Sequence, residues 1–190
     1  MKMLFSLLVA IAALTAPAAA REVSDCSRTE ADGERTLCVE IVVDAAPAEV
    51  WALWAEPEQL RTWLAPIAAI EMRQGGLMEV SYDAAQPLGD ARNILNRVVS
   101  VEPGQAFALQ IDRAPPGFPH ADEARALVTV IAIEPAENGA TRVRARMRGF
   151  REGVAYDELY AFFARGNAWT LQKLEERVTG GPVDWRAATE

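Results

Sequence analysis

The residues with the clearest chemical potential are polar side chains on an apolar helical face. At helical spacing between positions 155 and 178, one side carries Tyr156, Leu159, Tyr160, Phe163, Asn167, Thr170, Leu171, Leu174 and Val178. The other side carries Arg165, Gln172, Glu175 and Glu176. Two phenols, an amide and a hydroxyl exceed what packing alone requires, so this face predicts the wall of a lined pocket. A buried, unpaired Asn167 amide would cost about 1–3 kcal/mol, so it should bond a ligand, a strand residue or a trapped water.

His120 is the single histidine and the only candidate catalytic residue. As a general base it would need an orienting acid, and Asp122 or Glu123 is near enough in sequence. The alternative is an ordinary solvated histidine in the irregular segment 114–124. One histidine gives no metal-ligand spacing, and the sequence has neither a glycine-rich phosphate loop nor a Gly-x-Ser-x-Gly elbow. The sequence therefore predicts no metal and no cofactor.

Two cysteines, Cys26 and Cys38, flank a turn signal at Ala31-Asp32-Gly33 and are equidistant from its centre. A hairpin there would bring the two sulfurs together, and an oxidising compartment would join them in a disulfide. Closing this loop would contribute roughly 3 kcal/mol. We expect residues 21–34 to form a hairpin segment tied by this bond.

Residues 1–20 have the features of a secretory signal peptide. Lys2 is followed by a short apolar run and by Ala18-Ala19-Ala20, so cleavage is expected before Arg21. The run is too short to span a bilayer, and the exported chain, in the periplasm or outside the cell, is expected to have no membrane anchor. Loss of Lys2 changes the formal net charge from −8 to −9. Such an acidic chain is not expected to bind nucleic acid or anionic membranes.

The hydrophobic pattern of residues 35–180 predicts an α+β domain with a strand, two short helices, about six more strands and one long helix. Proline opens each short helix at Pro47 and Pro57. Short turns, including Gly75-Gly76, favour an antiparallel meander. We expect a curved sheet of six to seven strands wrapped on the C-terminal helix, with a peripheral tail at 181–190.

This order, with several short motifs, resembles the SRPBCC superfamily of START-like, helix-grip proteins. The motifs are Ala46-Pro47-Ala48-Glu49-Val50-Trp51, Pro57-Glu58-Gln59-Leu60 with Trp63, Gly75-Gly76, Val101-Glu102-Pro103-Gly104, and Gly166, Trp169 and Leu174. They are most similar to the branch of activator-of-heat-shock-protein-90-ATPase homologues. The resemblance implies a ligand cavity between helix and sheet, in a superfamily that binds lipids, hormones and polyketides and includes cyclases and hydrolases. An exported chain is not expected to meet a cytosolic chaperone.

We therefore predict a binding protein for a small lipophilic molecule. The candidate ligand-binding residues are Trp54, Trp63, Tyr82, Phe107, Phe118, Tyr156, Tyr160, Phe163, Asn167 and Leu171. Trp54 and Trp63 would form an aromatic cage or pack in the core, and Phe118 would be the apolar tip of a lid or part of a simple connection. The alternatives are a cyclase, isomerase or hydrolase using the same pocket, and an interaction module. The arginine row at 142, 144, 146 and 148 would bind an anionic partner or pair with acids on neighbouring strands.

Overall fold

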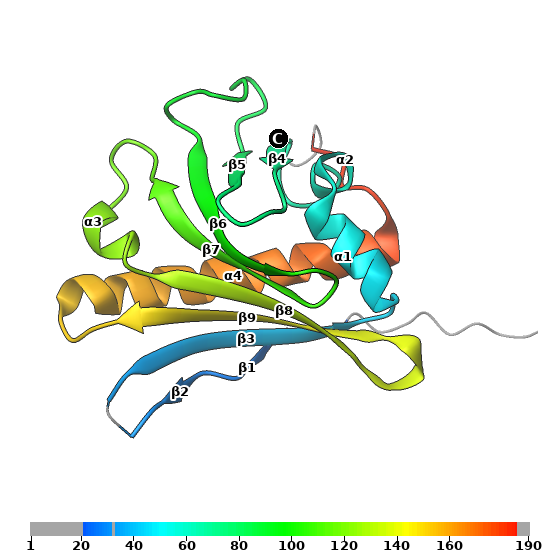
Figure 1. Ribbon diagram of the computed structural model, residues 1–190, viewed down its shortest axis with the longest axis horizontal. Helices are drawn as coiled ribbons and strands as arrows, with labels where there is room; N and C mark the ends of the chain where they lie inside the picture. Colours follow the sequence, from blue (N-terminus) through cyan, green and yellow to red (C-terminus); the bar gives the residue numbers. More distant parts are fainter. Residues whose placement is uncertain (1–20, 32, 186–190) are drawn as a thin grey trace, which may run out of the picture.

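One curved antiparallel sheet holds a long C-terminal helix against its concave side (Figure 1). The computed structural model describes residues 21–31 and 33–185. The expected signal peptide at 1–20, Asp32 in the predicted turn, and the end of the tail at 186–190 lie outside the described residues. Within the described part, the sequence of elements is the predicted one, and the helix-grip architecture is confirmed.

All neighbouring strands of the sheet are antiparallel, and their order is β1-β3-β9-β8-β7-β6-β5-β4, with β2 also pairing with β3. The later strands follow one another as a meander because each is joined to the next by a local connection. The strands are β1 Ser24–Asp25, β2 Arg28–Thr29, β3 Arg35–Val43, β4 Ile67–Ile70, β5 Leu77–Ser81, β6 Ile94–Glu102, β7 Ala106–Arg113, β8 Val128–Pro135 and β9 Thr141–Phe150.

The helices begin where the sequence indicates. Helix α1 spans Pro47–Ala55 and α2 spans Pro57–Leu60, each with proline in its first turn. The Glu49 carboxylate accepts a hydrogen bond of 2.9 Å from the Ala46 backbone N–H, which caps the start of α1. The segment 114–124, expected to be irregular throughout, contains the short helix α3 at Ala121–Ala124. A 3-10 turn, η1 at Glu137–Gly139, joins β8 to β9.

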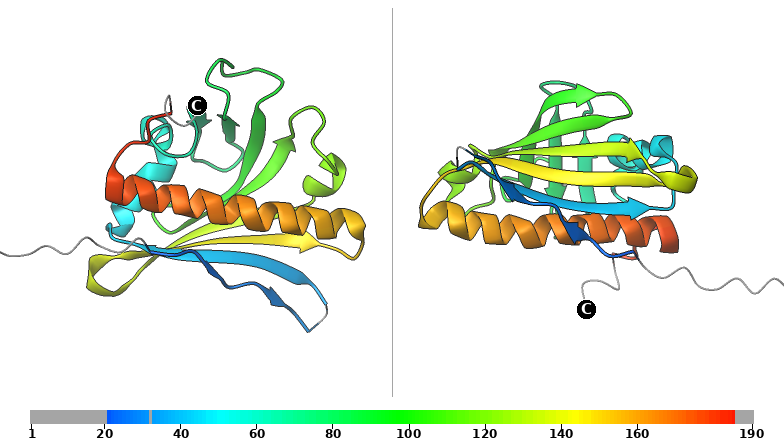
Figure 2. Two further views of the ribbon diagram at one scale, coloured as in Figure 1. Left: turned by 180° about the vertical axis from the view of Figure 1, so that it is seen from behind. Right: turned by 90° about the horizontal axis from the view of Figure 1, so that it is seen from below.

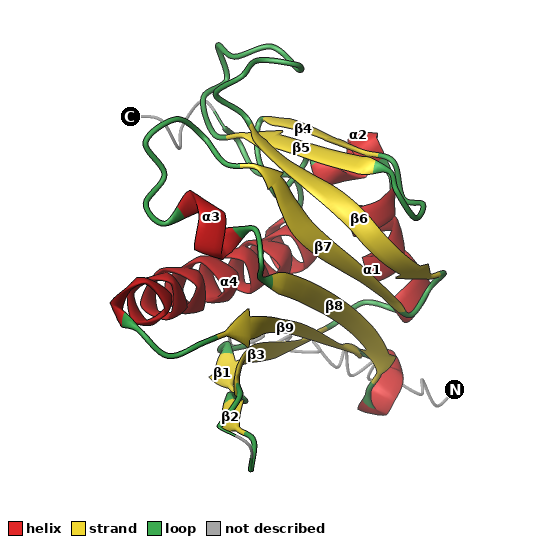
Figure 3. Cartoon of the chain, turned by 60° about the vertical axis from the view of Figure 1, so that its left-hand side comes forward, coloured by secondary structure: helices red, strands yellow, loops and turns green. Residues whose placement is uncertain are grey.

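Helix α4, Val154–Gly180, is attached to the sheet at both of its ends. Near its start, Leu159 packs with Leu37, Leu127 and other apolar residues in one buried cluster. Near its end, Leu171 and Leu174 belong to a second and larger cluster that includes α1 and α2. The sheet bends around the helix between these two clusters (Figure 3). The helix is therefore held firmly at two places, with the space between them set by the sheet's curvature.

The predicted orientation of α4 is correct for its leucines and wrong for Glu175. Leu159, Leu171 and Leu174 are buried, as the stripe predicts. Glu175 was expected on the outer face, yet it is only 4% exposed. The chain entering β1 runs beside this part of α4 (Figure 2), and the Arg21 backbone nitrogen lies 3.5 Å from Glu175 Oε1. Helical periodicity cannot report this burial, because the covering segment comes from the other end of the chain.

The disulfide between Cys26 and Cys38 is present in the structure. The Cys26 N–H donates a hydrogen bond of 2.9 Å to the Cys38 carbonyl, so the two cysteines lie side by side where β1 and β2 pair with β3. Cys38 is 3% exposed and belongs to the packed part of β3. The bond therefore fixes the short N-terminal strands to the edge of the main sheet.

Two of the four arginines of β9, Arg142 and Arg144, pair with acids on neighbouring strands. Arg144 Nε lies 2.6 Å from Glu40 on β3, and its Nη1 lies 2.8 Å from Glu134 on β8. The hydrogen bond to Glu40, followed by the charges of both acids, raises the pKa of Arg144 above its ordinary value. Arg142 lies more distantly, 3.8 Å from the same Glu40 carboxylate. Arg144 therefore joins three strands on the outer face of the sheet.

Replacing Arg144 with methionine is expected to lower the free energy of unfolding by about 1 kcal/mol, because two partly buried carboxylates lose a shared, well-aligned partner. Urea denaturation measures this change. The matched control is Arg148→Met, because Arg148 is exposed and makes no ion pair among the described residues. Equal losses in the two variants would show that the three-strand pairing contributes nothing specific.

Candidate functional site

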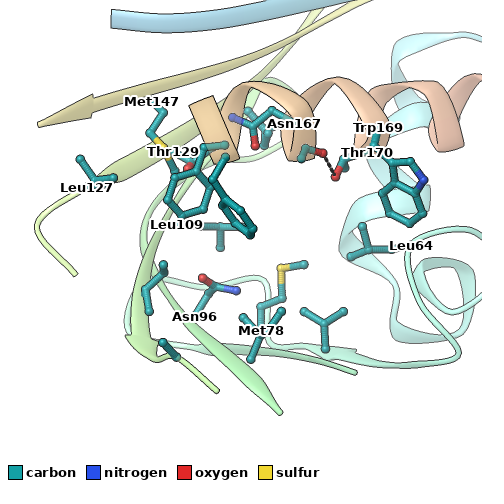
Figure 4. Close-up of a pocket in the computed structure, with 18 of the residues that line it drawn as sticks. Leu64, Met78, Asn96, Leu109, Leu127, Thr129, Met147, Asn167, Trp169 and Thr170 are labelled. Atoms are coloured by element: carbon teal, nitrogen blue, oxygen red, sulfur yellow. Dashed lines mark hydrogen bonds between the residues drawn. The ribbon is translucent and has the colours of Figure 1, made fainter. Parts of the chain in front are cut away.

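A cavity of about 450 Å³ lies between α4 and strands β5 to β9 (Figure 4). Such a volume is within the usual range for small-molecule sites in proteins. Its wall is mainly apolar: Met78 on β5, Leu109 on β7, Ile131 on β8 and Met147 on β9 are typical lining residues. The lining includes Leu127 and Met147 of one buried cluster and Trp54, Met78 and Ile131 of the other, so the cavity lies between the two clusters.

The middle of α4 supplies the helical wall. Phe163, Gly166, Asn167 and Thr170 line the cavity between the anchoring leucines described above. Gly166 has ordinary helical geometry, and a Cβ atom built on it would meet no atom within 4 Å. A glycine inside a helix costs about 1 kcal/mol relative to alanine, and neither backbone strain nor close packing requires it here. What the missing side chain does provide is free space at the cavity.

Aromatic side chains surround the opening. Tyr82, Phe162 and Trp169 line the cavity and are 48%, 43% and 40% exposed, so the cavity meets solvent beside them. Tyr82 packs edge-on against Trp169 with ring centroids 5.5 Å apart, and Phe118 packs in the same way on Phe162 at 5.3 Å. The opening thus lies beside these two aromatic pairs, each of which joins a residue of α4 to a residue in a loop of the sheet.

Few polar groups interrupt this apolar wall. Among the described residues, Asn96, Thr129 and Asn167 line the cavity with side chains that form no hydrogen bond to the protein. Asn167 comes from α4, whereas Thr129 and Asn96 come from strands β8 and β6 (Figure 4). Thr170 differs, because its hydroxyl donates a hydrogen bond of 2.9 Å to the Gly166 carbonyl. Aspartate, glutamate, lysine, arginine and histidine are absent from the lining in the described part of the chain.

Comparison with known proteins identifies this architecture. The family model described as "Activator of Hsp90 ATPase homolog 1-like protein" matches residues 44–179, which is most of the chain. The chain belongs to this family. The resemblance inferred from the sequence motifs is thereby confirmed. No curated protein matches the chain at a significant level.

Solved structures agree with the fold of this Aha1-like chain. The Aha1 dimer from Colwellia psychrerythraea has 15% sequence identity and a TM-score of 0.61, and the alignment covers 77% of this chain and 97% of that one. Protein MLL2253 from Mesorhizobium loti has 20% identity and a TM-score of 0.59, with 82% and 99% covered. CalU16 from Micromonospora echinospora has 16% identity and a TM-score of 0.58, with 90% and 91% covered. At these identities the likeness establishes the fold alone.

Five of the ten predicted ligand-binding residues of this Aha1-like chain lie on the cavity wall: Trp54, Tyr82, Phe118, Phe163 and Asn167. Their contact with a ligand stays a prediction.

The other five lie outside the wall because they pack elsewhere. Trp63 is fully buried and donates a hydrogen bond of 2.9 Å to the Leu53 carbonyl, and Phe107 packs against Trp54 at 5.3 Å. Tyr156 and Tyr160 belong to the cluster at the start of α4, where Tyr160 contacts Phe150 at 5.0 Å. Leu171 is fully buried in the larger cluster. Tyr156 and Tyr160, expected in the pocket, therefore lie with the cluster at the start of α4 and not on the cavity wall.

His120 also lies outside the cavity lining, and its partner is not one of the expected acids. Its Nε2 is 2.7 Å from Glu158 Oε2 on α4, whereas Asp122 pairs with Arg125. The His120–Glu158 contact joins the α3 segment to α4. Since Glu158 is well exposed, replacing His120 with alanine is expected to cost no more than about 1 kcal/mol and to leave ligand affinity within about twofold of wild type. Thermal unfolding and ligand titration of this variant check both expectations. A large loss of ligand affinity would show that His120 contributes to the binding site.

Tyr82 offers a pH-dependent test of the opening. Although 48% of the residue is exposed, burial of its phenol against neighbouring protein raises its pKa above the ordinary value of 10.0. As the pH rises, Tyr82 loses its proton at a lower pH in the unfolded chain than in the folded protein. Deprotonation therefore favours the unfolded chain, and the free energy of unfolding falls above about pH 10. Absorbance titration, with Tyr82→Phe to assign the transition, should show one late-ionising phenol. Trp169→Ala should move that transition towards the ordinary value, and an unchanged transition would contradict the packing explanation.

Several lining residues were not among the predicted ligand-binding residues. Phe162 and Trp169 fall beside the apolar stripe rather than on it, and Asn96 and Thr129 are polar residues on strands that otherwise alternate regularly. Gly166 gave the one usable signal, since a glycine in the middle of a helix needs a reason.

The described helices include none that is long and apolar enough to cross a membrane, and the described residues contain no group of three or more potential metal ligands.

Proposed function

We propose that this chain is a binding protein that holds a small lipophilic molecule in the cavity between α4 and the sheet. The observation that carries the proposal is an apolar cavity of about 450 Å³ located between two separately packed clusters. Because the clusters fix both ends of α4, the cavity does not depend on a ligand to keep helix and sheet apart. The space left at Gly166 supports the same function.

The lining favours binding over acid–base catalysis. General acids and bases are usually histidine, carboxylate or lysine side chains within hydrogen-bond reach of the reacting group. Among the described lining residues, the only ionisable side chain is Tyr82, at the opening. Such a wall binds a ligand mainly through apolar contact, which contributes about 25 cal/mol to the binding free energy per Å² of apolar surface removed from water.

We further propose that the protein acts outside the cytosol, in the periplasm or beyond, after loss of residues 1–20. The disulfide supports this location because such bonds persist mainly in oxidising compartments. In that location the chain would not meet a cytosolic chaperone, despite the name of its family. Expression in an export-competent bacterium, followed by N-terminal sequencing of the protein outside the cytoplasmic membrane, should give Arg21 as the first residue. Retention of the full chain in the cytosol would overturn this location.

The binding function is tested by incubating the purified protein with a total lipid extract and analysing it by native mass spectrometry. We expect a retained molecule of defined mass, extractable into organic solvent. The control is Thr129→Trp, which fills the cavity from β8 and should retain nothing. A wild-type protein that retains no molecule, or a retained molecule that is equally abundant in the filled variant, would contradict the proposal.

A further inference from the structure

Two hydrogen-bond donors of cavity-lining residues are buried without any acceptor. They are Nδ2 of Asn167 on α4 and Nε1 of Trp54 on α1, and neither has a partner among the described residues. Trp54 is 2% exposed, so water does not reach most of its side chain. Leaving a buried donor unpaired costs about 1–3 kcal/mol, which is why nearly all such groups in proteins are satisfied. Two exceptions in the wall of one cavity call for a common explanation.

The charge of the wall limits what the missing acceptor can be. In the described residues the lining carries no formally charged side chain, so an ionised ligand would lose its hydration without gaining a counter-ion. A neutral oxygen, such as that of a ketone, ester or ether, accepts hydrogen bonds without that penalty. The unpaired hydroxyl of Thr129 on β8 would offer a further hydrogen-bonding group in the cavity wall.

We propose that the ligand is an uncharged lipophile with at least one carbonyl-type oxygen, and that this oxygen accepts a hydrogen bond from Asn167 Nδ2. Trp54 Nε1 is the second unpaired donor, on the side of α1. The apolar remainder of the ligand lies along the strands and below the aromatic opening. This inference rests on the proposed binding function and names the class of molecule that the site selects.

Three nearly isosteric probes separate the contributions of the carbonyl oxygen, the apolar surface and the negative charge to binding. They are acetylnaphthalene, ethylnaphthalene and naphthoate. Affinities are taken from the ligand-induced rise in Tm. The wild-type protein should bind the ketone about tenfold more tightly than the hydrocarbon, which corresponds to one hydrogen bond, and should bind the carboxylate least. Asn167→Leu should abolish the preference for the ketone and keep or improve binding of the hydrocarbon. Trp54→Phe should reduce the preference in part.

The control is Tyr160→Phe, since Tyr160 lies on the same helix but packs against Phe150 outside the cavity, and loss of its hydroxyl should leave the preference unchanged. Retained binding of ethylnaphthalene shows that each variant is folded. If the wild type binds none of the probes and retains nothing from lipid extract, the binding function itself fails. If it binds ketone and hydrocarbon equally, or if Asn167→Leu keeps the preference, the function stands and this inference is overturned.

The buried carboxylate of Glu175 on α4 lacks a cation. Glu175 is 4% exposed and accepts a hydrogen bond of 3.2 Å from the Thr179 hydroxyl, but it forms no ion pair with any described residue. The guanidinium of Arg21 points elsewhere, to Asp44 at 3.2 Å and to the Val42 carbonyl at 3.3 Å. From outside the helix, the backbone N–H of Arg21 donates a hydrogen bond of 3.5 Å to Glu175 Oε1. A buried carboxylate without a cation is strongly unfavourable.

We infer that cleavage before Arg21 supplies this cation. Hydrolysis of the Ala20–Arg21 peptide bond by a signal peptidase consumes one water, leaving a carboxylate on Ala20 and an amine on Arg21. At neutral pH this amine is largely protonated, since its ordinary pKa is about 7.7–8.0. The amide of the precursor would thus become an ammonium group beside Glu175. Processing would stabilise the mature fold by completing an ion pair between the new N-terminus and α4.

The test compares purified chains that begin at Arg21 with chains that begin at Ala20, each with Glu175 or with Glu175→Gln. The Arg21 form should unfold about 2–4 °C higher than the Ala20 form, and Glu175→Gln should remove this difference. Glu176→Gln is the control, since Glu176 is partly exposed and pairs with Lys173, and the difference should persist in it. Equal Tm values for the two wild-type forms, or a difference that survives Glu175→Gln, would overturn the inference. The result does not depend on whether a ligand is found.

Discussion

Replacing Thr129 with tryptophan is expected to abolish ligand binding, at least 100-fold in affinity, while leaving the protein as stable as wild type or more so. Thr129 lies on β8 at the cavity wall, and its hydroxyl has no partner among the described residues, so removing it leaves no protein group unpaired. Tryptophan is well suited to a strand, and its indole would occupy space now empty. Filled cavity volume is worth about 24 cal/mol per Å³, so the apo protein should gain up to about 2 kcal/mol.

Loss of ligand affinity together with unchanged or raised stability makes the prediction specific, because a substitution that damages the fold would lower stability and affinity together. The comparison variant is Gly166→Ala, which should stabilise α4 by up to about 1 kcal/mol while adding only one methyl group to the cavity wall. Urea denaturation and titration with acetylnaphthalene measure both properties for each variant. If Thr129→Trp binds the probe as tightly as Gly166→Ala does, the ligand does not occupy this cavity, and the proposed function loses its site.

The elements of the fold were predictable because each has a local cause. Alternation along β9 and β3, proline at the start of α1 and α2, and the leucine stripe of α4 are all visible within short windows of sequence. Their order was enough to suggest the helix-grip arrangement. The hairpin between Cys26 and Cys38 was likewise a local inference from a turn signal between two cysteines.

The cavity wall was only half predictable, for a physical reason. Periodicity reports which side chains face inward, but not where the helix and the sheet stand apart. Tyr160 and Asn167 lie on the same stripe, yet Tyr160 packs against Phe150 and Asn167 lines open space. The difference is set by the curvature of the sheet, which depends on contacts between strands distant in sequence. Glu175 was misplaced for the same kind of reason, since a segment about 150 residues away covers it.

The disulfide should contribute more to stability than any other single feature of the N-terminal segment. Replacing Cys26 and Cys38 together with alanine is expected to lower the free energy of unfolding by about 3 kcal/mol, as the loop between them has a sequence separation of 12. Strands β1 and β2 have two residues each, so their backbone pairing alone holds this segment weakly. The expected fall in Tm is about 6–12 °C.

The consequences of losing the bond should extend beyond the segment itself. If β1 and β2 detach, β3 becomes an exposed edge strand, which favours association between molecules. Glu175 would also lose the Arg21 nitrogen beside it. Urea denaturation and light scattering of the double variant and of reduced wild type measure both effects, with oxidised wild type as the control. The double variant and reduced wild type should behave alike. A loss in the free energy of unfolding well below 1 kcal/mol, with no added light scattering, would mean that pairing with β3 holds the N-terminal strands without the disulfide.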